Sequence, residues 1–438
     1  MVMDVIQVEY EGKVVGALSF DDVLKIGVFE YSKEFIATGV ELSPLMMPLS
    51  NAQYSFPDLQ YATYKKLPGL IADSLPDDFG NQVLNAWVSK HGRDPQSITP
   101  LERLRHIGQR GMGALEYRPA SDVQGFSGSK QVEILELLTI AQNVLDQRSE
   151  LDVGLSKGGK ADQEAMMALL SVGTSAGGAR PKAVLAFNDD FTSVRSGQAE
   201  VPEGYEHYLM KFDGVSEHNK NKETFGDPQG YGAMEYAYHR LAVKCGIEMM
   251  PCELLQEGDR QHFLTRRFDR VGNKKIHTQT LNGLAHVDYK KPGLYSYAQL
   301  FDVARKLNLS AEAAEQLFRR MVFNVVARNH DDHAKNFSFM LVEDEWKLAP
   351  AYDLAFSYKP GSPWVDSHWM TLNGKRDQFE MSDFLAFEKI SPIFTEDKIR
   401  EILEQTLDVV SGWRGLAQKS DVPKRLIDTV EKNLRLNF

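Results

Sequence analysis

The stretch Ala327-Arg328-Asn329-His330-Asp331-Asp332-His333-Ala334-Lys335-Asn336 decides how the rest of this sequence is interpreted. Apolar residues at helical spacing precede it and predict a helix over residues 311–328, which Ser310 can cap. An apolar run over residues 337–341 follows it and predicts a strand. Polar residues this dense between two hydrophobic elements indicate a functional loop.

The spacing within this loop is that of a phosphoryl-transfer site. Asp331 and Asn336 stand five residues apart, as do the aspartate and asparagine of the catalytic loop of protein kinases. There the aspartate takes the proton of the substrate hydroxyl and the asparagine binds magnesium. Asp353 follows a predicted strand pair over residues 337–341 and 346–348, and would be the second magnesium ligand. The sequence thus predicts Asp331 as the base and Asn336 and Asp353 as metal ligands.

Two other interpretations of the loop stay open on the residues alone. Residues 330–333 could bind a transition metal in a phosphohydrolase, because histidine and aspartate are common ligands of such metals. That interpretation leaves Asn336 and Asp353 without a role, and His286 and His368 are isolated. A purely structural loop is the third possibility, since Asp and Asn also form turns and caps.

A second candidate site precedes the loop by about a third of the chain. Residues 173–182 are rich in small residues and lead into a strand predicted over residues 183–187. Small residues let backbone amides approach an anion closely, although a surface turn would have the same composition. The candidate phosphate contacts are Ser175, Ala176, Gly177, Gly178, Ala179, Arg180 and Lys182.

One lysine and one glutamate extend this candidate site. Lys211 lies near the end of a strand predicted over residues 207–212, where a lysine could pair with nucleotide phosphates. An ordinary exposed lysine is the alternative. Glu235 begins a predicted helix and could be the ion-pair partner of Lys211, or a first-turn carboxylate favoured by the helix dipole.

Composition restricts the class of protein. The chain has 438 residues with a net charge of −11, which argues against nucleic-acid binding by the whole surface and leaves a local basic patch or a DNA-binding partner. Its two cysteines, Cys245 and Cys252, predict a reducing compartment. Neither a signal peptide nor an apolar run long enough to span a bilayer is evident. We therefore expect a cytoplasmic protein with no membrane segment.

The order of elements predicts an α+β fold with two kinase-like lobes. A β-rich middle part precedes a helical C-terminal part, and the polar loop lies at the changeover. Serines and glycines over residues 119–130 mark a domain boundary. We expect an N-terminal β-rich domain over residues 1–122, a kinase N-lobe over 123–270 and a helical C-lobe over 271–438.

Several motifs resemble one known family. Residues 331–338 are similar to the D-G-H-A-K-N-F-S block of the HipA toxins, which are bacterial serine/threonine kinases of type II toxin–antitoxin modules. Residues 349–353 resemble their P-x-Y-D block, and residues 175–182 resemble their phosphate-binding loop. Arg267-Phe268-Asp269-Arg270 resembles the end of their E-R-F-D-R hairpin. The segments 73–77 and 111–113 fit their N-terminal domain, so the similarity spans most of the chain in the same order.

The resemblance implies a phosphatidylinositol-kinase-like fold with an extra N-terminal β-rich domain, and it implies ATP and magnesium (Mg²⁺) as cofactors. It also implies that Ser175 is autophosphorylated, which in the family displaces the loop and switches the kinase off. A phosphate adds up to about two negative charges and would lie where nucleotide phosphates bind. Further ATP contacts are implied for four residues, Arg266, Phe268, His333 and Lys335.

The resemblance also implies partners. In the family a dimeric helix-turn-helix antitoxin, HipB, neutralises the toxin, and their complex represses its own operon. This would reconcile an acidic chain with operator DNA, which would be bound mainly through the antitoxin. The expected protein substrate is an aminoacyl-tRNA synthetase such as glutamyl-tRNA synthetase, whose inhibition causes growth arrest and persistence. A catalytically inactive kinase fold that acts only as a co-repressor is the alternative.

Three positions depart from the family pattern. Asp332 replaces the glycine after the expected base and would add a negative charge beside it. Arg266 stands where some members have glutamate at the nucleotide hinge. Arg180-Pro181 would stiffen the phosphate loop. These changes leave the expected reaction class in place.

Overall fold

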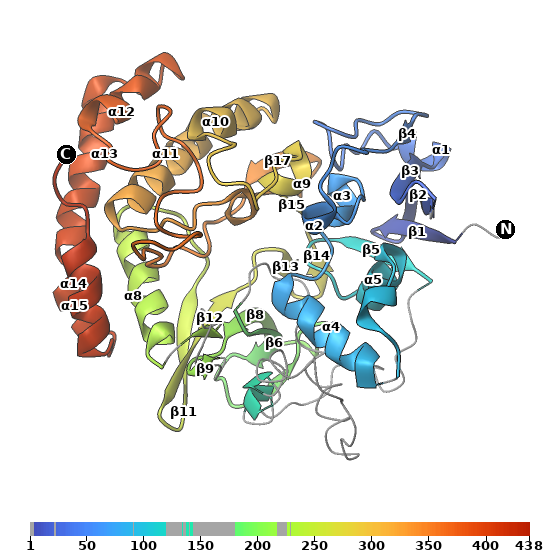
Figure 1. The fold of residues 1–438 in the computed structure, drawn as a ribbon, viewed down its shortest axis with the longest axis horizontal. Coiled ribbons are helices and arrows are strands. Elements are labelled where there is room, and N and C mark those ends of the chain that lie inside the picture. Colours follow the sequence, from blue (N-terminus) through green and yellow to red (C-terminus); the bar gives the residue numbers. More distant parts are fainter. Residues whose placement is uncertain are drawn as a thin grey trace. The chain divides into compact units, whose positions relative to one another are not determined.

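The structure is a computed structural model that describes residues 4–21, 23–90, 92–119, 134, 137–139, 141–142, 180–216, 226–227 and 229–438. The chain divides into two compact units. Figure 1 labels helices and strands of both. Unit 1 holds residues 1–42, 47–232 and 253–278, and unit 2 holds residues 43–46, 233–252 and 279–438. Each unit is described by itself.

The N-terminal part of unit 1 is an antiparallel sheet with the strand order β4-β3-β2-β1-β5. Buried side chains alternate along its strands, as in Ile6 and Val8 of β1, so one face covers a core. A tight turn at Glu11 and Gly12, both with positive φ, joins the first two strands. The bounds are β1 (Val5–Tyr10), β2 (Lys13–Asp21), β3 (Ile26–Tyr31), β4 (Gln53–Tyr54) and β5 (Leu115–Arg118).

Short helices accompany this sheet. Thr99 and Glu102 form a capping box at the start of α5, and Pro100 fits the first helical position. The bounds are α1 (Lys33–Ile36), α2 (Tyr61–Tyr64), α3 (Gly69–Ala72), α4 (Asp78–Lys90), η1 (Pro95–Ser97) and α5 (Pro100–Ile107).

A second sheet in unit 1 has the strand order β11-β12-β8-β6-β7. Ala183, Leu185 and Phe187 of β6 share one hydrophobic core with Phe79 and Val83 of α4, so helix and sheet are packed together. The strands are β6 (Lys182–Asn188), β7 (Val194–Ser196), β8 (Tyr205–Lys211), β11 (Cys252–Glu257) and β12 (Arg260–Arg266). Two short antiparallel pairs are β9 (Val215–Ser216) with β10 (Gly226–Asp227), and β13 (Arg270–Val271) with β14 (Lys274–Lys275). Strand β15 (His277–Thr280) contains the boundary between the units.

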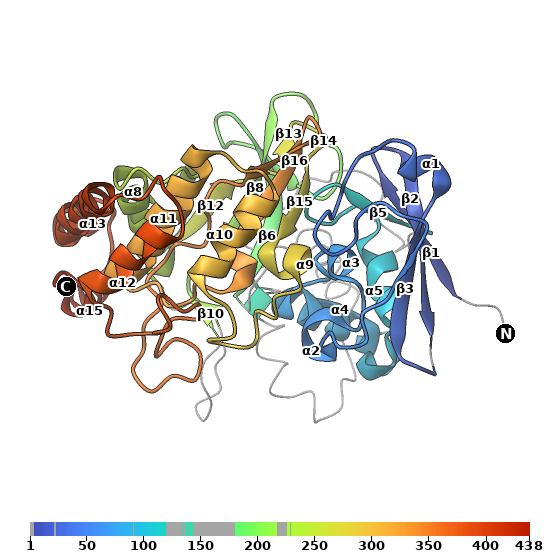
Figure 2. The same ribbon diagram turned by 90° about the horizontal axis from the view of Figure 1, so that it is seen from above.

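Unit 2 is mainly helical. Helices α10 (Tyr297–Lys306) and α11 (Ala311–Val326) lie side by side (Figure 2), and Ser310 caps α11 as predicted. Four aromatic rings, Phe301, Phe318, Phe387 and Phe394, pack at centroid distances of 4.8 to 6.1 Å and join α10 and α11 to the helices that follow. The remaining elements are α8 (Tyr231–Lys244), α9 (Leu281–Ala285), η2 (Ala334–Asn336), β16 (Ser338–Val342), β17 (Glu345–Leu348), α12 (Met381–Leu385), η3 (Ala386–Lys389), α13 (Glu396–Ser411), α14 (Trp413–Gln418) and α15 (Lys424–Asn433). Within the described ranges, no helix combines the length and hydropathy required to cross a bilayer.

Candidate active site

The polar loop begins where α11 ends. The buried Tyr238 of α8 donates a hydrogen bond of 2.8 Å from its hydroxyl to the carbonyl oxygen of Ala327, which caps the C-terminus of α11. Arg328 then adopts a left-handed φ of 57°, which turns the chain out of the helix. Asn329 is buried and donates its side-chain amide to Asn324 Oδ1 at 2.8 Å. Packing and hydrogen bonds therefore fix the first residues of the loop.

The two ends of the predicted catalytic motif, Asp331 and Asn336, contact each other. The Nδ2 atom of Asn336 donates a hydrogen bond of 2.7 Å to the backbone oxygen of Asp331. This bond orients the amide group and leaves its Oδ1 as the atom that could bind the predicted magnesium ion. The side chain of Asp331 is 41% exposed, and its Oδ1 lies 3.6 Å from His333 Nε2. The structure thus places an accessible carboxylate and an oriented side-chain amide in one loop, and their catalytic roles stay a prediction.

Asp353 is tied to the same loop through its neighbour. The hydroxyl of Tyr352 donates a hydrogen bond of 2.6 Å to the carbonyl oxygen of Lys335 and lies 2.5 Å from Ser338 Oγ. Asp353 itself has a left-handed φ of 57°, which aspartate tolerates better than most residues. The oxygen ligands of Asn336 and Asp353 match the preference of magnesium, so the residues present fit this ion.

The structure gives Asp332 an anchoring role in addition to the negative charge that the sequence predicted. Its carboxylate is buried and accepts hydrogen bonds from Tyr297 Oη (2.6 Å), His368 Nδ1 (2.9 Å) and the backbone N–H of Trp369 (2.7 Å). Burial alone would raise the pKa of Asp332, but the charge of His368 and these hydrogen bonds lower it below the usual value. Asp332 therefore keeps the negative charge that was expected next to Asp331, and its hydrogen bonds anchor the loop to the rest of unit 2.

His333 and Lys335 both lie against Tyr289. The ring of His333 meets that of Tyr289 edge-on at 5.2 Å, and Lys335 Nζ lies 4.9 Å from the Tyr289 ring centroid. In the part of the chain that the structure describes, no group of three His, Cys, Asp or Glu side chains is arranged to hold a metal ion. The phosphohydrolase interpretation thus gains no support from the geometry of residues 330–333.

The candidate phosphate-binding residues of unit 1 lie on β6 and β8. Lys182 is paired directly with Lys211 in the antiparallel ladder, so both side chains project from the same face of the sheet. Both lysines are buried, and Lys211 Nζ lies 5.9 Å from the ring centroid of Phe263. The sequence predicted each of these two lysines as a phosphate ligand, but it did not predict that they are neighbours.

The loop before Lys182 is described only at its end. The guanidinium group of Arg180 lies 5.9 Å from the ring centroid of Tyr231. Five predicted contacts, Ser175, Ala176, Gly177, Gly178 and Ala179, lie outside the described residues.

The hairpin end at residues 266–270 contains two kinds of residue. Arg266 forms a half-exposed ion pair of 2.7 Å with Glu206, and Phe268 is half-buried. The residues between and after them are buried: Arg267 donates from Nε and Nη2 to Asp269 at 2.8 and 2.7 Å, and Arg270 Nη1 donates to Asp269 Oδ2 at 2.8 Å.

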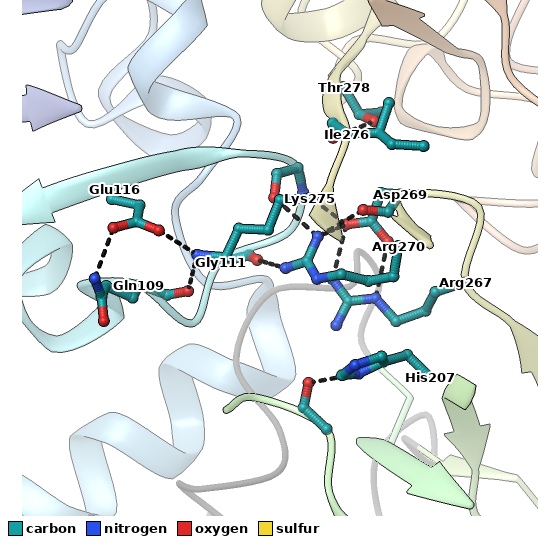
Figure 3. Close-up of polar contacts among 12 residues, drawn as sticks. Gln109, Gly111, Glu116, His207, Arg267, Asp269, Arg270, Lys275, Ile276 and Thr278 are labelled. Carbon is teal, nitrogen blue, oxygen red and sulfur yellow. Dashed lines mark hydrogen bonds and ion pairs between the residues drawn. The ribbon is translucent and has the colours of Figure 1, made fainter. Parts of the chain in front are cut away.

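This buried cluster binds a segment from the N-terminal part of unit 1 (Figure 3). Asp269 Oδ2 accepts a hydrogen bond of 2.7 Å from the backbone N–H of Gly113, and Arg270 donates to the carbonyl oxygens of Gly111 and Gly113 at 2.9 Å. Burial alone would raise the pKa of Asp269, but Arg267 and Arg270 lower it far below the usual value. This connection was not predicted, because the two motifs lie far apart in the sequence and each was interpreted separately.

Two family models match this chain, one in its N-terminal part and one in the rest. The family model "HipA N-terminal domain" matches residues 6–118, and the model "HipA-like C-terminal domain" matches residues 174–413, which is more than half of the chain. The chain belongs to the HipA family. The solved structure of HipA from Shewanella oneidensis MR-1, in the complex of HipA, HipB and operator DNA, is similar with a TM-score of 0.65 at 15% identity. That similarity covers 98% of this chain and 95% of the other, and it confirms the predicted fold class.

Curated relatives match over shorter segments. The "Toxin YjjJ" of Escherichia coli is 29% identical over 194 residues, which cover 44% of this chain and 40% of that protein. The "Putative kinase Y4mE" of Sinorhizobium fredii is 29% identical over 127 residues, which cover 26% of this chain and 30% of that protein. The HipA-family chain thus spans less than half the length of these two relatives.

Proposed function

We propose that this HipA-family protein is a toxin that acts as an ATP-dependent serine/threonine protein kinase. The observation that carries the proposal is the hydrogen bond from Asn336 to the backbone of Asp331, together with the link from Tyr352 to the same loop. These contacts join Asn336 to Asp331 and tie the neighbour of Asp353 to the same loop, and the order and chemistry of the three residues match the base and the two metal ligands of phosphoryl transfer. The names of the kinase and toxin relatives agree with this reaction.

Each residue has a part in the proposed reaction. Asp331, whose carboxylate is accessible, accepts the proton of the acceptor hydroxyl. Asn336 Oδ1 and the carboxylate of Asp353 hold magnesium, and Lys182 and Lys211 offer positive charge to phosphate oxygens. Bound ATP and magnesium supply the transferable phosphoryl group and the charge that neutralises it. The proposed further contacts to ATP are Arg180, Arg266, Phe268, His333 and Lys335, with the loop over residues 175–179.

Regulation and partners are part of the proposal. We infer that Ser175 is autophosphorylated and that the added charge opposes nucleotide binding. The HipA of Shewanella oneidensis forms a complex with HipB and operator DNA. By analogy, a HipB-like helix-turn-helix antitoxin dimer would neutralise the present toxin and carry it to operator DNA.

The proposal extends to the target and to the domain division. The proposed substrate is an aminoacyl-tRNA synthetase such as glutamyl-tRNA synthetase in the cytoplasm, and the outcome would be growth arrest and persistence. Three domains, over residues 1–122, 123–270 and 271–438, remain our proposal for the division of the chain.

The test uses the full-length purified chain. It is first treated with a phosphatase, which is then removed, and afterwards incubated with magnesium and labelled ATP, beside Ser175→Ala and Asp331→Asn. We expect label on Ser175 by mass spectrometry in the wild type and none on that peptide in either variant. If the wild type neither acquires label nor binds ATP, the proposal of kinase activity is refuted. The alternative of an inactive kinase fold that acts as a co-repressor would then remain.

A further inference from the structure

Two oppositely charged side chains are buried together between the segments that the two family models match. Lys182 Nζ lies 3.0 Å from Asp77 Oδ2, and the side chains are only 5% and 4% exposed. Asp77 lies within the segment matched by the N-terminal model, and Lys182 within that of the C-terminal model. The contact is an ion pair without hydrogen-bond geometry, because Asp77 Oδ2 has no hydrogen-bond partner among the described residues. Each buried charge therefore depends on the other.

The position of Asp77 is fixed by the fold. Its Oδ1 accepts a hydrogen bond of 2.6 Å from the backbone N–H of Gly80 and caps the start of α4. Phe79 and Val83 of this helix pack in the same core as Ala183 and Leu185 of β6. The helix that carries Asp77 and the strand that begins with Lys182 are thus held together by apolar packing, and the carboxylate cannot leave the ammonium group without disturbing that core.

The surroundings of Lys182 explain why a carboxylate is needed there. Lys182 and Lys211 are directly opposed on β6 and β8, and both are buried. Like charges at directly opposed positions repel each other, and burial increases the repulsion. Asp77 offsets this repulsion at Lys182 and holds its ammonium group at one place.

We propose that Asp77 is a positioning residue of the phosphoryl-transfer site, which acts through Lys182. Its carboxylate orients the Lys182 ammonium group beside Lys211, so that the two lysines present a fixed pair of charges to the phosphates of the nucleotide. The N-terminal domain of this HipA-family protein thereby supplies one residue of the kinase machinery. The inference rests on the proposed function.

A double-mutant cycle tests this inference in the full-length chain. The variants are Asp77→Asn, Lys182→Met and the two together, and the rate of Ser175 autophosphorylation is measured against ATP concentration. Asparagine caps a helix as well as aspartate does, so Asp77→Asn removes the charge and keeps the start of α4. We expect the KM for ATP to rise about tenfold in each single variant and no further in the double variant, with kcat changed less than KM.

The matched control is Asp78→Asn, which removes the neighbouring exposed carboxylate. If Asp77→Asn behaves like this control, or if the two effects multiply in the double variant, Asp77 does not act through Lys182. Melting curves show whether Asp77→Asn is folded, because it leaves Lys182 buried without a counter-charge. If Asp77→Asn is unfolded, the KM of Lys182→Met is compared with that of the double variant, which buries no lone charge. Equal KM values in these two variants would then support the inference, and different values would refute it. A wild type without autophosphorylation would instead refute the proposed function.

Discussion

The Nδ1 atom of His368 lies 2.9 Å from Oδ2 of Asp332, and neither side chain is accessible to solvent. The same carboxylate oxygen accepts a hydrogen bond from Tyr297 on α10, and the other accepts one from the backbone of Trp369. One aspartate therefore joins the polar loop to helix α10 and to residues 368–369. The residue that departs from the HipA sequence pattern is thus a structural anchor of the loop.

Replacement of Asp332 by alanine should destabilise the protein strongly. The change leaves the Tyr297 hydroxyl, the His368 imidazole and the Trp369 amide buried without their acceptor. We expect a loss of about 3 kcal/mol in the free energy of unfolding, measured by urea denaturation. Asp331→Ala is the matched control, because the side chain of Asp331 is 41% exposed, and it should change stability by less than about 1 kcal/mol. Equal losses in the two variants would contradict the anchoring role of Asp332.

The hairpin cluster allows two ion pairs of equal length to be compared. Arg267 and Asp269 are 2.7 Å apart with side chains 2% and 0% exposed, whereas Arg266 and Glu206 are 2.7 Å apart with side chains 35% and 34% exposed. Asp269→Asn should cost about 3 kcal/mol or more, because it leaves Arg267 and Arg270 without their counter-charge. Glu206→Gln should cost less than about 1 kcal/mol, because solvent screens the exposed pair.

Hydrogen exchange adds a local measurement to this comparison. The amide of Gly113 donates a hydrogen bond to Asp269. Its hydrogen-exchange rate should therefore increase in Asp269→Asn and stay the same in Glu206→Gln. Unchanged protection of Gly113 in Asp269→Asn would show that the cluster does not hold the N-terminal segment.

Local patterns in the sequence predicted the elements well, and their ends less well. The apolar period and Ser310 located α11. Apolar residues at helical spacing predict a helix over residues 81–91, whereas α4 begins at Asp78, because Asp77 caps it. The pattern over residues 396–413 predicts one helix, but α13 ends at Ser411 and Gly412 separates it from α14.

The candidate site was predictable only where its residues are close in the sequence. Asp331 and Asn336 are linked within one loop, so their spacing carries the information. The partners of Asp332 come from α10 and from residues 368–369. Lys182 pairs with Asp77, which lies in the segment matched by the N-terminal family model. Such pairs depend on tertiary packing, for which a single sequence contains no periodic signal.

Acid should destabilise the protein through its buried histidines. Burial lowers the pKa of His277 to about 4, although its hydrogen bond to the Leu42 carbonyl opposes the shift. Because the folded pKa lies below the unfolded value, the unfolded state takes up the proton first as the pH falls. The stabilising contribution is therefore complete above about pH 6.5 and is lost towards pH 4, by about 3 kcal/mol for one such group. The pKa values of four other histidines are lowered in the same way, to about 4 in His106, His207, His262 and His286.

Urea denaturation of the wild type and of His277→Gln between pH 7 and pH 4.5 measures this effect. The variant should lose less stability over that interval than the wild type, whatever its stability at pH 7. If the free energy of unfolding changes equally with pH in both proteins, His277 does not keep a lowered pKa in the folded protein.

Loss of the Tyr352 hydroxyl should raise the magnesium concentration that the proposed kinase needs for autophosphorylation. Tyr352→Phe removes the hydrogen bonds to the Lys335 carbonyl and to Ser338 Oγ, so the segment that carries Asp353 is held less firmly to the polar loop. One such bond contributes about 1 kcal/mol, so the magnesium concentration for half-maximal autophosphorylation should rise roughly fivefold. Tyr295→Phe removes a comparable hydrogen bond to a backbone carbonyl elsewhere in unit 2 and serves as the control. If both variants need the same magnesium concentration as the wild type, the bridge from Tyr352 does not set the position of Asp353.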